Sequence, residues 1–262
     1  MLKKDDNIGA ALGEIGCRFR SAIEDHIKDY RLLNEDDIEW LLEPLDAISH
    51  PTGIVLSAFR KGDHLGWVYE LYFHDKNASA IYMPFDPPYE KYNGRINLFD
   101  EEDNIPDPKP YNKMMLVNGL ANYYTILAVP KIWDDLSVSF TEMGIWQVLL
   151  LHEAYTFMPK GWHGNYFSHW YVFTQEDMQH VIEKYSSYNS VDHEELASYL
   201  GRDDILPSVK IDRDKAVVSY CIWTKWGGLR RLTVPVERHN QSVKFGKWER
   251  QALVKYDCGI RF

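Results

Sequence analysis

A histidine and a glutamate stand side by side near the middle of the sequence, at His152 and Glu153. They follow an almost wholly apolar stretch, residues 144–151, in which Gln147 is the only polar side chain. Ionisable groups beside a buried segment need a partner or a shifted pKa, and such groups occur both at active sites and at structural sites. An imidazole and a carboxylate together could carry acid–base chemistry or contribute to a metal site.

The same two residues open the HExxH motif of zinc hydrolases, but the motif is not completed. Thr156 stands where the second histidine should follow one helical turn later. Two histidines further along, His163 and His169, could complete a site only if the chain folds back towards His152. The metal hypothesis therefore takes His152, His163 and His169 as ligands of zinc or another divalent metal, with Glu153 as the acid–base group.

We expect residues 140–157 to form the central helix. Ser139 and Glu142 fit a capping box, and a proline and a glycine beyond the stretch end the helix. A helix that is apolar all round is normally buried, and this one is too short to span a bilayer. Because neighbouring helical residues point about 100° apart, His152 and Glu153 are expected on different faces of it.

The least regular part of the chain, residues 84–110, is rich in proline and carries the acidic run Asp100, Glu101, Glu102 and Asp103. Loops of this length are uncommon inside compact domains and tend to be binding loops, lids or linkers. The acidic run is therefore a candidate contact for a basic partner. The same loop is the place where the chain would divide if it formed two units.

The aromatic stretch after the central helix offers a second candidate binding surface. Trp162 and His163 stand between Gly161 and Gly164, which would let the backbone come close to a ligand. We expect these two side chains to be exposed. For Tyr171, further along the same stretch, we expect a place in the core.

Charge and composition exclude some classes of function. The formal net charge is −10, and phosphate binding needs a basic patch, so nucleic acid is not expected as the main partner. The three cysteines form no CxxC pattern, and no apolar run has the length of a membrane span or a signal peptide. We therefore expect a cytoplasmic protein without a membrane partner. Neither a glycine-rich phosphate-binding motif nor a nucleophile elbow is present, which disfavours the common enzyme classes.

The hydrophobic patterns predict an α+β fold in one domain, residues 1–262, which could subdivide at the 84–110 loop. The expected elements are an amphipathic helix over residues 7–31, a largely antiparallel sheet with strands near 53–84 and 207–238, and the buried central helix over 140–157. A less regular helix is expected to begin after Asn112. Thr174 and Asp177 are expected to cap a helix over the residues that follow.

Two functions from different classes fit these observations. The leading hypothesis is a non-catalytic cytoplasmic binding protein, acidic and rich in aromatic residues, that neutralises a basic protein partner as an immunity protein or antidote does. It needs no cofactor, and its contact residues would be Asp100–Asp103, Trp162 and His163. The alternative is a metal-dependent hydrolase-type enzyme with its site at the C-terminal end of the 140–157 helix, using His152, Glu153, His163 and His169.

Overall fold

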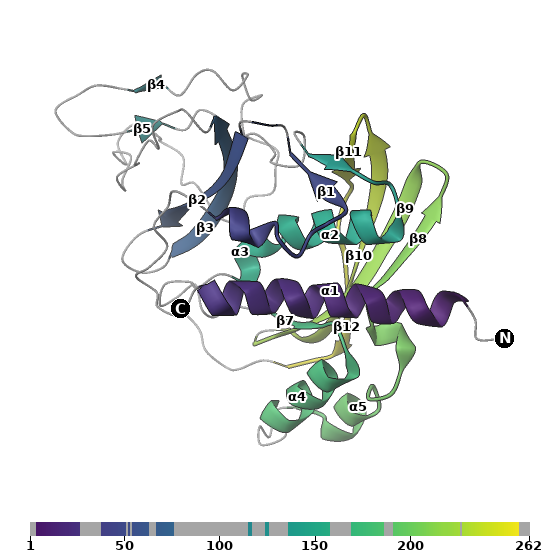
Figure 1. Cartoon of the computed structure of the whole chain (residues 1–262). Coiled ribbons are helices and arrows are strands. Elements are labelled where there is room, and N and C mark those ends of the chain that lie inside the picture. The colour runs from purple at the N-terminus through teal and green to yellow at the C-terminus, as the bar shows by residue number, and fades with distance from the viewer. Residues whose placement is uncertain are drawn as a thin grey trace.

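The structure is a computed structural model of the whole chain (Figure 1). It describes residues 4–26, 38–50, 52, 54–62, 67–75, 115–116, 124–125, 136–157, 169–185, 191–225 and 227–256. The proline-rich acidic loop at 84–110 lies outside these residues, so a subdivision of the chain there stays a prediction. Among the described residues, none of the helices has both the length and the apolar character that crossing a membrane requires.

A six-stranded antiparallel sheet forms the centre of the molecule. Two long strands, β9 (Lys215–Thr224) and β10 (Gly228–His239), pair with each other along the whole of β9. On the other side of β9 lie β8 (Ser208–Asp212) and β7 (His169–Val172), and on the other side of β10 lie β11 (Ser242–Phe245) and β12 (Glu249–Val254). The turn from β9 into β10 requires glycine, because Gly228 has a φ of +70° and any Cβ there would meet the carbonyl oxygen of Val254.

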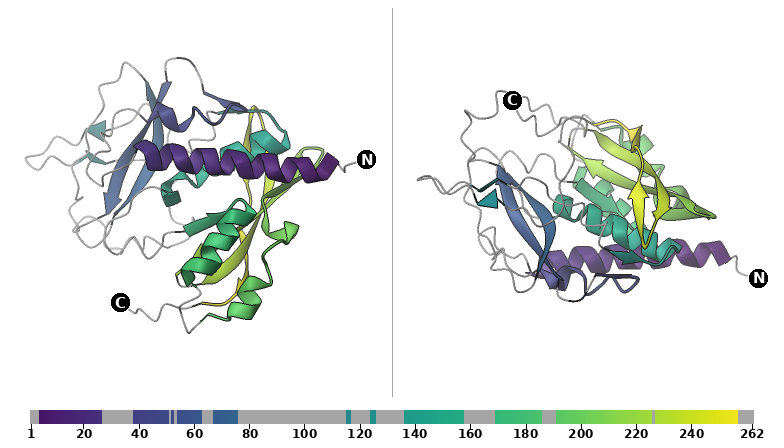
Figure 2. Two further views of the ribbon diagram at one scale, coloured as in Figure 1. Left: turned by 60° about the horizontal axis from the view of Figure 1, so that its bottom comes forward. Right: turned by 90° about the horizontal axis from the view of Figure 1, so that it is seen from above.

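Side chains alternate across this sheet, and helices cover both faces near its β7 end. Val218, Tyr220 and Ile222 of β9 point into a core shared with α1 (Lys4–His26) and α2 (Glu142–His152). Cys221 and Trp223 point the other way, towards α4 (Gln175–Tyr185) and α5 (His193–Ala197). Figure 1 shows α1 and α2 side by side, with α4 and α5 forming a separate helical layer. The right-hand view of Figure 2 places α1 and α2 along one side of the sheet.

The long N-terminal helix packs closely because it has glycines on its inner face. Its apolar residues Leu12, Phe19 and Ile23 are almost fully buried, as the amphipathic pattern predicts. A Cβ at Gly16 would lie within 2.7 Å of the Phe173 ring, so a larger residue there would push α1 away. The helix spans Lys4–His26, and residues 27–31 of the predicted helix are outside the described part.

The central helix exists but begins and ends differently from the prediction. Its N-cap is Thr141, whose hydroxyl accepts a hydrogen bond from the Gly144 N–H at 3.2 Å, so the predicted capping box of Ser139 and Glu142 is wrong. Ser139 is used elsewhere, because its N–H donates to the carbonyl oxygen of Ala47. At the other end the helix stops at His152, and a separate short helix, α3 (Ala154–Phe157), follows after a turn at Glu153.

A polar side chain inside the core fixes the preceding loop onto this helix. Gln147 is fully buried, and its amide oxygen accepts from the Ala47 N–H at 2.7 Å while its amide nitrogen donates to Asp46 Oδ1 at 2.6 Å. Both ends of the side-chain amide are therefore satisfied, as burial requires. The loop held in this way carries η1 (Glu39–Leu41) and β1 (Ile48–Ser49).

The remaining strands form small separate sheets. The hairpin of β2 (Ile54–Gly62) and β3 (Trp67–Asp75) stands beside the main sheet (Figure 2). Two-residue strands pair as β1 with β6 (Ser137–Val138) and as β4 (Met115–Leu116) with β5 (Tyr124–Thr125). A 3₁₀ turn, η5 (Asp203–Ile205), precedes β8. The prediction of a helix after Asn112 is wrong for Met115–Leu116 and Tyr124–Thr125, because both segments are strands.

The predicted α+β class, with antiparallel strands, an N-terminal helix and a buried central helix, is confirmed. The strands predicted near 53–84 and those predicted near 207–238 do not share a sheet in the described residues. The first group forms the β2–β3 hairpin, and the second belongs to the six-stranded sheet. The predicted cap of α4 is also confirmed: Thr174 Oγ1 accepts from the Asp177 N–H, and Asp177 Oδ2 accepts from the N–H groups of Phe173 and Thr174.

Candidate functional site

The break between α2 and α3 places a buried carboxylate at Glu153. Its backbone N–H donates to the carbonyl oxygen of Leu149 at 2.9 Å and so completes the last turn of α2. The side chain then turns inward and the residue is only 7% exposed. A carboxylate this deep needs hydrogen-bond donors around it.

Two side chains donate to Glu153. The hydroxyl of Tyr171, on β7, donates to Oε2 at 2.7 Å, and His152 Nδ1 lies 3.1 Å from Oε1. The expectation that His152 and Glu153 point apart is therefore wrong. It assumed a continuous helix, whereas the turn at Glu153 brings the two side chains together.

These partners keep the carboxylate ionised. Burial alone would raise the pKa of Glu153, but the hydrogen bond and electrostatic effect of His152, the hydrogen bond from Tyr171 and the electrostatic effect of His169 outweigh it. The pKa of Glu153 therefore lies below its ordinary value. At neutral pH this group accepts hydrogen bonds and orients its neighbours, and it is not a proton donor.

Aromatic rings close around the cluster. The His152 ring packs edge-on against Phe245, with centroids 4.9 Å apart, and lies 5.6 Å from Trp248. The Tyr171 ring stacks on Phe157 at 4.2 Å. This packing restricts both rings to one orientation, and only a fifth of the His152 side chain reaches solvent.

The structure brings together some of the predicted metal ligands. His152 and His169 both act on Glu153, whereas His163 and Trp162 lie outside the described residues. Across the part of the chain that the structure describes, no three histidine, cysteine, aspartate or glutamate side chains form a group that could hold a metal ion. Zinc binding by His152, His163 and His169 stays a prediction.

Sequence reasoning overlooked the role of Tyr171. The prediction that it lies in the core is confirmed, since it is 2% exposed, but its hydroxyl is a direct partner of Glu153. A signal was present, because His169 and Tyr171 are two positions apart on one strand and so share a face. Together with Glu153 and His152 they form an arrangement in which a carboxylate fixes an imidazole, as general acid–base sites require.

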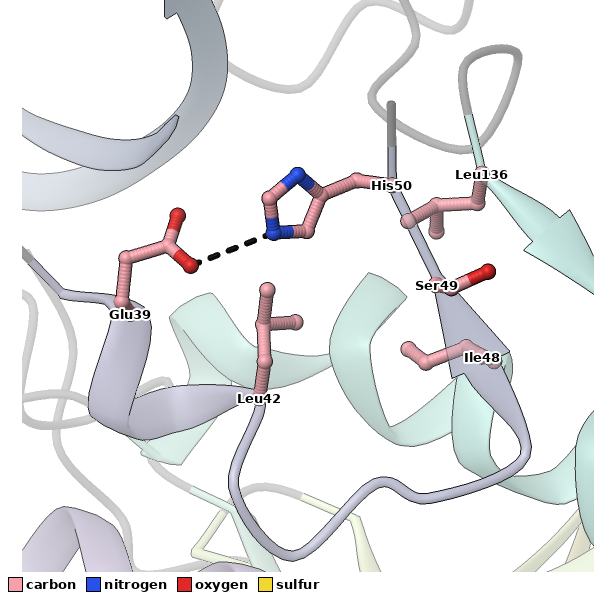
Figure 3. A pocket seen from close by; sticks show the side chains of 6 residues that line it. All are labelled: Glu39, Leu42, Ile48, Ser49, His50 and Leu136. Atoms are coloured by element: carbon pink, nitrogen blue, oxygen red, sulfur yellow. Dashed lines mark hydrogen bonds and ion pairs between the residues drawn. The ribbon is translucent and has the colours of Figure 1, made fainter. Parts of the chain in front are cut away.

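A second histidine–carboxylate pair borders a hollow on the surface (Figure 3). His50 Nε2 lies 3.2 Å from Glu39 Oε2, and Glu39 Oε1 accepts a hydrogen bond from the Leu56 N–H. The hollow measures about 250 Å³, and its lining consists of Glu39, Leu42, Ile48, Ser49, His50 and Leu136. Sequence reasoning did not nominate this place. Its signal is charge: residues 39–50 contain three carboxylates and neither lysine nor arginine.

The cysteine of β9 is not a nucleophile in this structure. Cys221 is fully buried, and burial raises the pKa of its thiol to about 11, although Arg231 nearby acts in the opposite direction. The thiol is therefore protonated at neutral pH, and only the thiolate is an effective nucleophile. Cys221 therefore packs as a small buried apolar residue.

Comparison with known proteins gives no relative from which a role could be transferred. The chain matches no protein-family profile, no curated protein and no solved structure. The acidic run Asp100–Asp103 lies outside the described residues, so its role as a contact surface stays a prediction.

Proposed function

We propose that the protein is a non-catalytic binding protein that engages a basic protein partner, in the manner of an immunity protein. The observation that carries the proposal is the hollow beside Glu39 and His50, since it is a concave site on the described surface, with a carboxylate in its lining and two further carboxylates on the loop that borders it. Glu43 is exposed on the same loop, and Asp46 lies there as well. Apolar pockets with a few convergent polar groups are the usual form of binding sites.

The charge of the chain supports the same proposal. Acidic residues outnumber basic ones by 39 to 29 in the whole sequence, and the run Asp100–Asp103 adds four carboxylates in succession. Complementary charge speeds encounter with an oppositely charged partner and disfavours partners of like charge. Binding of this kind should weaken as ionic strength rises.

The test begins with capture of the partner from the protein's own cells, its identification by mass spectrometry and its purification. Affinity is then measured for the wild type and for two variants that each lose four negative charges. One variant replaces Asp100, Glu101, Glu102 and Asp103 by their amides. The matched control replaces four exposed glutamates elsewhere, Glu14, Glu24, Glu194 and Glu195, by glutamine.

We expect the loop variant to bind at least about tenfold more weakly, which corresponds to roughly 1.4 kcal/mol, and the control to change much less. Equal loss of affinity in both variants would show that only the net charge of the protein matters. It would contradict a direct contact between the partner and the loop. Failure to recover any basic protein that binds the purified chain would overturn the proposed function.

A second candidate function, a hydrolase-type enzyme, is favoured by one observation: His152, Glu153, His169 and Tyr171 gather at the end of α2. In that function, without a metal, Glu153 would orient the His152 imidazole, which would transfer the proton. If a metal were bound, His152 would instead be a ligand together with His163 and His169. Its test is elemental analysis of untagged protein as isolated. About one equivalent of zinc, lost in His152→Ala without loss of fold, would support the enzyme. Unfolding of that variant would indicate a structural histidine.

A further inference from the structure

We propose that an uncovered part of the main sheet is the surface on which a second copy of this chain packs, so that two copies form a symmetric dimer. The surface belongs to β8, β9, β10, β11 and the start of β12, at the end of the sheet away from α4 and α5. We call it the strand patch. The inference goes beyond the proposed function, because the strand patch shares no residue with the hollow beside Glu39.

The register of the strands places three rows of side chains on this face. The first row runs across the strands as Asp212, Lys215, Glu237 and Lys244. The second row is Lys210, Val217, Pro235 and Gly246, and the third is Ser208, Ser219, Thr233 and Glu249. Residues two positions apart on a strand point to the same face, so the three rows form one continuous surface.

The middle of the strand patch is apolar and open to solvent. Val217 is 43% exposed, and it is one of two large apolar side chains that are this open among the described residues. Pro235, directly opposite it on β10, is exposed as well. Further along the same face, Cys221 and Trp223 are buried in the core shared with α4 and α5, which Figure 1 shows at the other end of the sheet. Covering the open apolar pair would therefore be favourable.

The charges of the first row indicate what covers it. Their signs alternate across the strands as negative, positive, negative and positive. A two-fold axis that lies in the interface, parallel to the strands and between β9 and β10, reverses the order of the strands in the second copy. Lys215 then faces Glu237 of the second copy, and Asp212 faces its Lys244. Every charge of the row meets its opposite, so the row is self-complementary, as a two-fold interface requires.

The same row disfavours neighbouring registers. If the axis lay on β9, Lys215 would face Lys215 of the second copy. If it lay on β10, Glu237 would face Glu237. Like charges directly opposite each other are repulsive, so the alternation selects one arrangement and opposes its two nearest alternatives.

The second row fits the selected arrangement. Val217 faces Pro235 of the second copy, which brings the two exposed apolar side chains into contact. Lys210 faces Gly246, which has no side chain to obstruct the methylene stem of the lysine. The strands of the two copies run in nearly the same direction, as in sheets that pack face to face about 10 Å apart.

The central charges already form an ion pair within one chain. Lys215 Nζ lies 3.2 Å from Glu237 Oε1, and the two side chains are 75% and 58% exposed. An exposed pair of this kind adds little to the stability of one chain. In the dimer the two pairs form a ring of four alternating charges, so no ion is buried without its opposite.

The size of the strand patch predicts a weak dimer. Neighbouring strands are about 4.8 Å apart and successive rows about 7 Å apart, so the patch measures roughly 20 Å by 20 Å. The two copies together would bury on the order of 1,000 Å², which is at the lower end for specific interfaces. We expect a dissociation constant on the order of 100 μM.

The experiment is sedimentation equilibrium of the full-length protein at physiological salt, at subunit concentrations up to about 1 mM, where a dimer of this affinity is largely formed. Lys215→Glu and Glu237→Lys each place like charges opposite each other and should raise the dissociation constant at least about tenfold. An equimolar mixture of the two variants should associate again, because each charge of one variant then faces its opposite on the other. The double variant Lys215→Glu/Glu237→Lys should associate for the same reason.

Two further variants complete the test. Glu24→Lys makes the same charge change as Glu237→Lys at an exposed position of α1 and should leave the dissociation constant unchanged. Val217→Asp should abolish the dimer without altering the ion pair. Circular dichroism and thermal unfolding check that each variant is folded.

Three outcomes would overturn the inference. The first is a wild type that stays monomeric at about 1 mM. The second is a dimer that neither Lys215→Glu nor Glu237→Lys weakens, because its interface would then lie elsewhere. The third is a mixture of these two variants that fails to associate, because Lys215 and Glu237 would then not face each other across the interface.

Discussion

The molecule contains two histidine–glutamate pairs that resemble each other in distance but differ in their surroundings. His152 and Glu153 are 3.1 Å apart and His50 and Glu39 are 3.2 Å apart. Each glutamate accepts a second hydrogen bond, Glu153 from the Tyr171 hydroxyl and Glu39 from the Leu56 N–H. The Glu153 side chain is 10% exposed, whereas the Glu39 side chain is 34% exposed and lines a hollow. The contact distance is therefore no guide to what each pair does.

The difference in burial assigns different roles to the two carboxylates. A buried charge without hydrogen-bond partners is strongly destabilising, so Glu153 should hold its partners His152 and Tyr171 in place. Nearer the surface a carboxylate keeps part of its hydration, so the contacts of Glu39 should add less to stability.

Replacing each glutamate by alanine should separate the two pairs most widely. Glu153→Ala leaves the Tyr171 hydroxyl and His152 without their acceptor inside the core and should lower the free energy of unfolding by about 3 kcal/mol. Glu39→Ala should lower it by about 1 kcal/mol, because the Glu39 side chain is 34% exposed and its contacts compete with water. Urea unfolding followed by tryptophan fluorescence measures both. Equal losses would show that burial does not distinguish the pairs.

The pH dependence of stability should reveal the buried carboxylate. Because the folded state lowers the pKa of Glu153, its ionised form stabilises the protein fully above the pKa of an unfolded glutamate, about 4.3. This stabilisation is lost as the pH falls below that value and through the lower folded pKa. Glu153→Gln should therefore show a smaller loss of unfolding free energy between about pH 5 and pH 3 than the wild type. Parallel curves for the two proteins would contradict an ionised Glu153.

Local patterns explain the parts of the fold that could be predicted. The spacing of Leu12, Phe19 and Ile23 identifies α1, and Thr174 with Asp177 identifies the start of α4, because a helix face and a cap each involve residues only a few positions apart. The cap of α2 was misplaced because Ser139 and Thr141 are both good cap residues. In the structure Thr141 caps the helix, and the Ser139 N–H donates to the carbonyl oxygen of Ala47, which is distant in the chain.

Both candidate sites escaped full prediction for the same reason. Tyr171 and Glu153 are 18 positions apart and meet only because β7 joins β9 in the sheet. Leu136 reaches the hollow beside Glu39 next to the point where β1 pairs with β6. Such contacts depend on strand pairing between distant segments, which a hydrophobic pattern does not encode. The three carboxylates of residues 39–50 can be read from the sequence, but the hollow beside Glu39 cannot.

Removing the Tyr171 hydroxyl tests how much its hydrogen bond to Glu153 contributes to stability. Tyr171→Phe keeps the stacked ring and deletes the O–H that donates to Oε2, so it should lower the free energy of unfolding by about 1.5 kcal/mol. In the Glu153→Gln background the same change should cost less, since the acceptor is then neutral. A double-mutant cycle from urea unfolding gives this coupling. Zero coupling would indicate that Tyr171 contributes only through its ring.

The smallest expected effect lies at the exposed pair. His50→Ala removes a side chain that contacts a carboxylate still one third exposed, so it should change the free energy of unfolding by only about 0.5 kcal/mol. Raising the salt concentration to about 1 M should shrink even this difference, because the screening length then falls to about 3 Å. His152→Ala serves as the comparison: its loss should be larger and nearly independent of salt, since aromatic rings shield that pair from ions. If instead the His50 effect were large and insensitive to salt, Glu39 would be a structural anchor like Glu153.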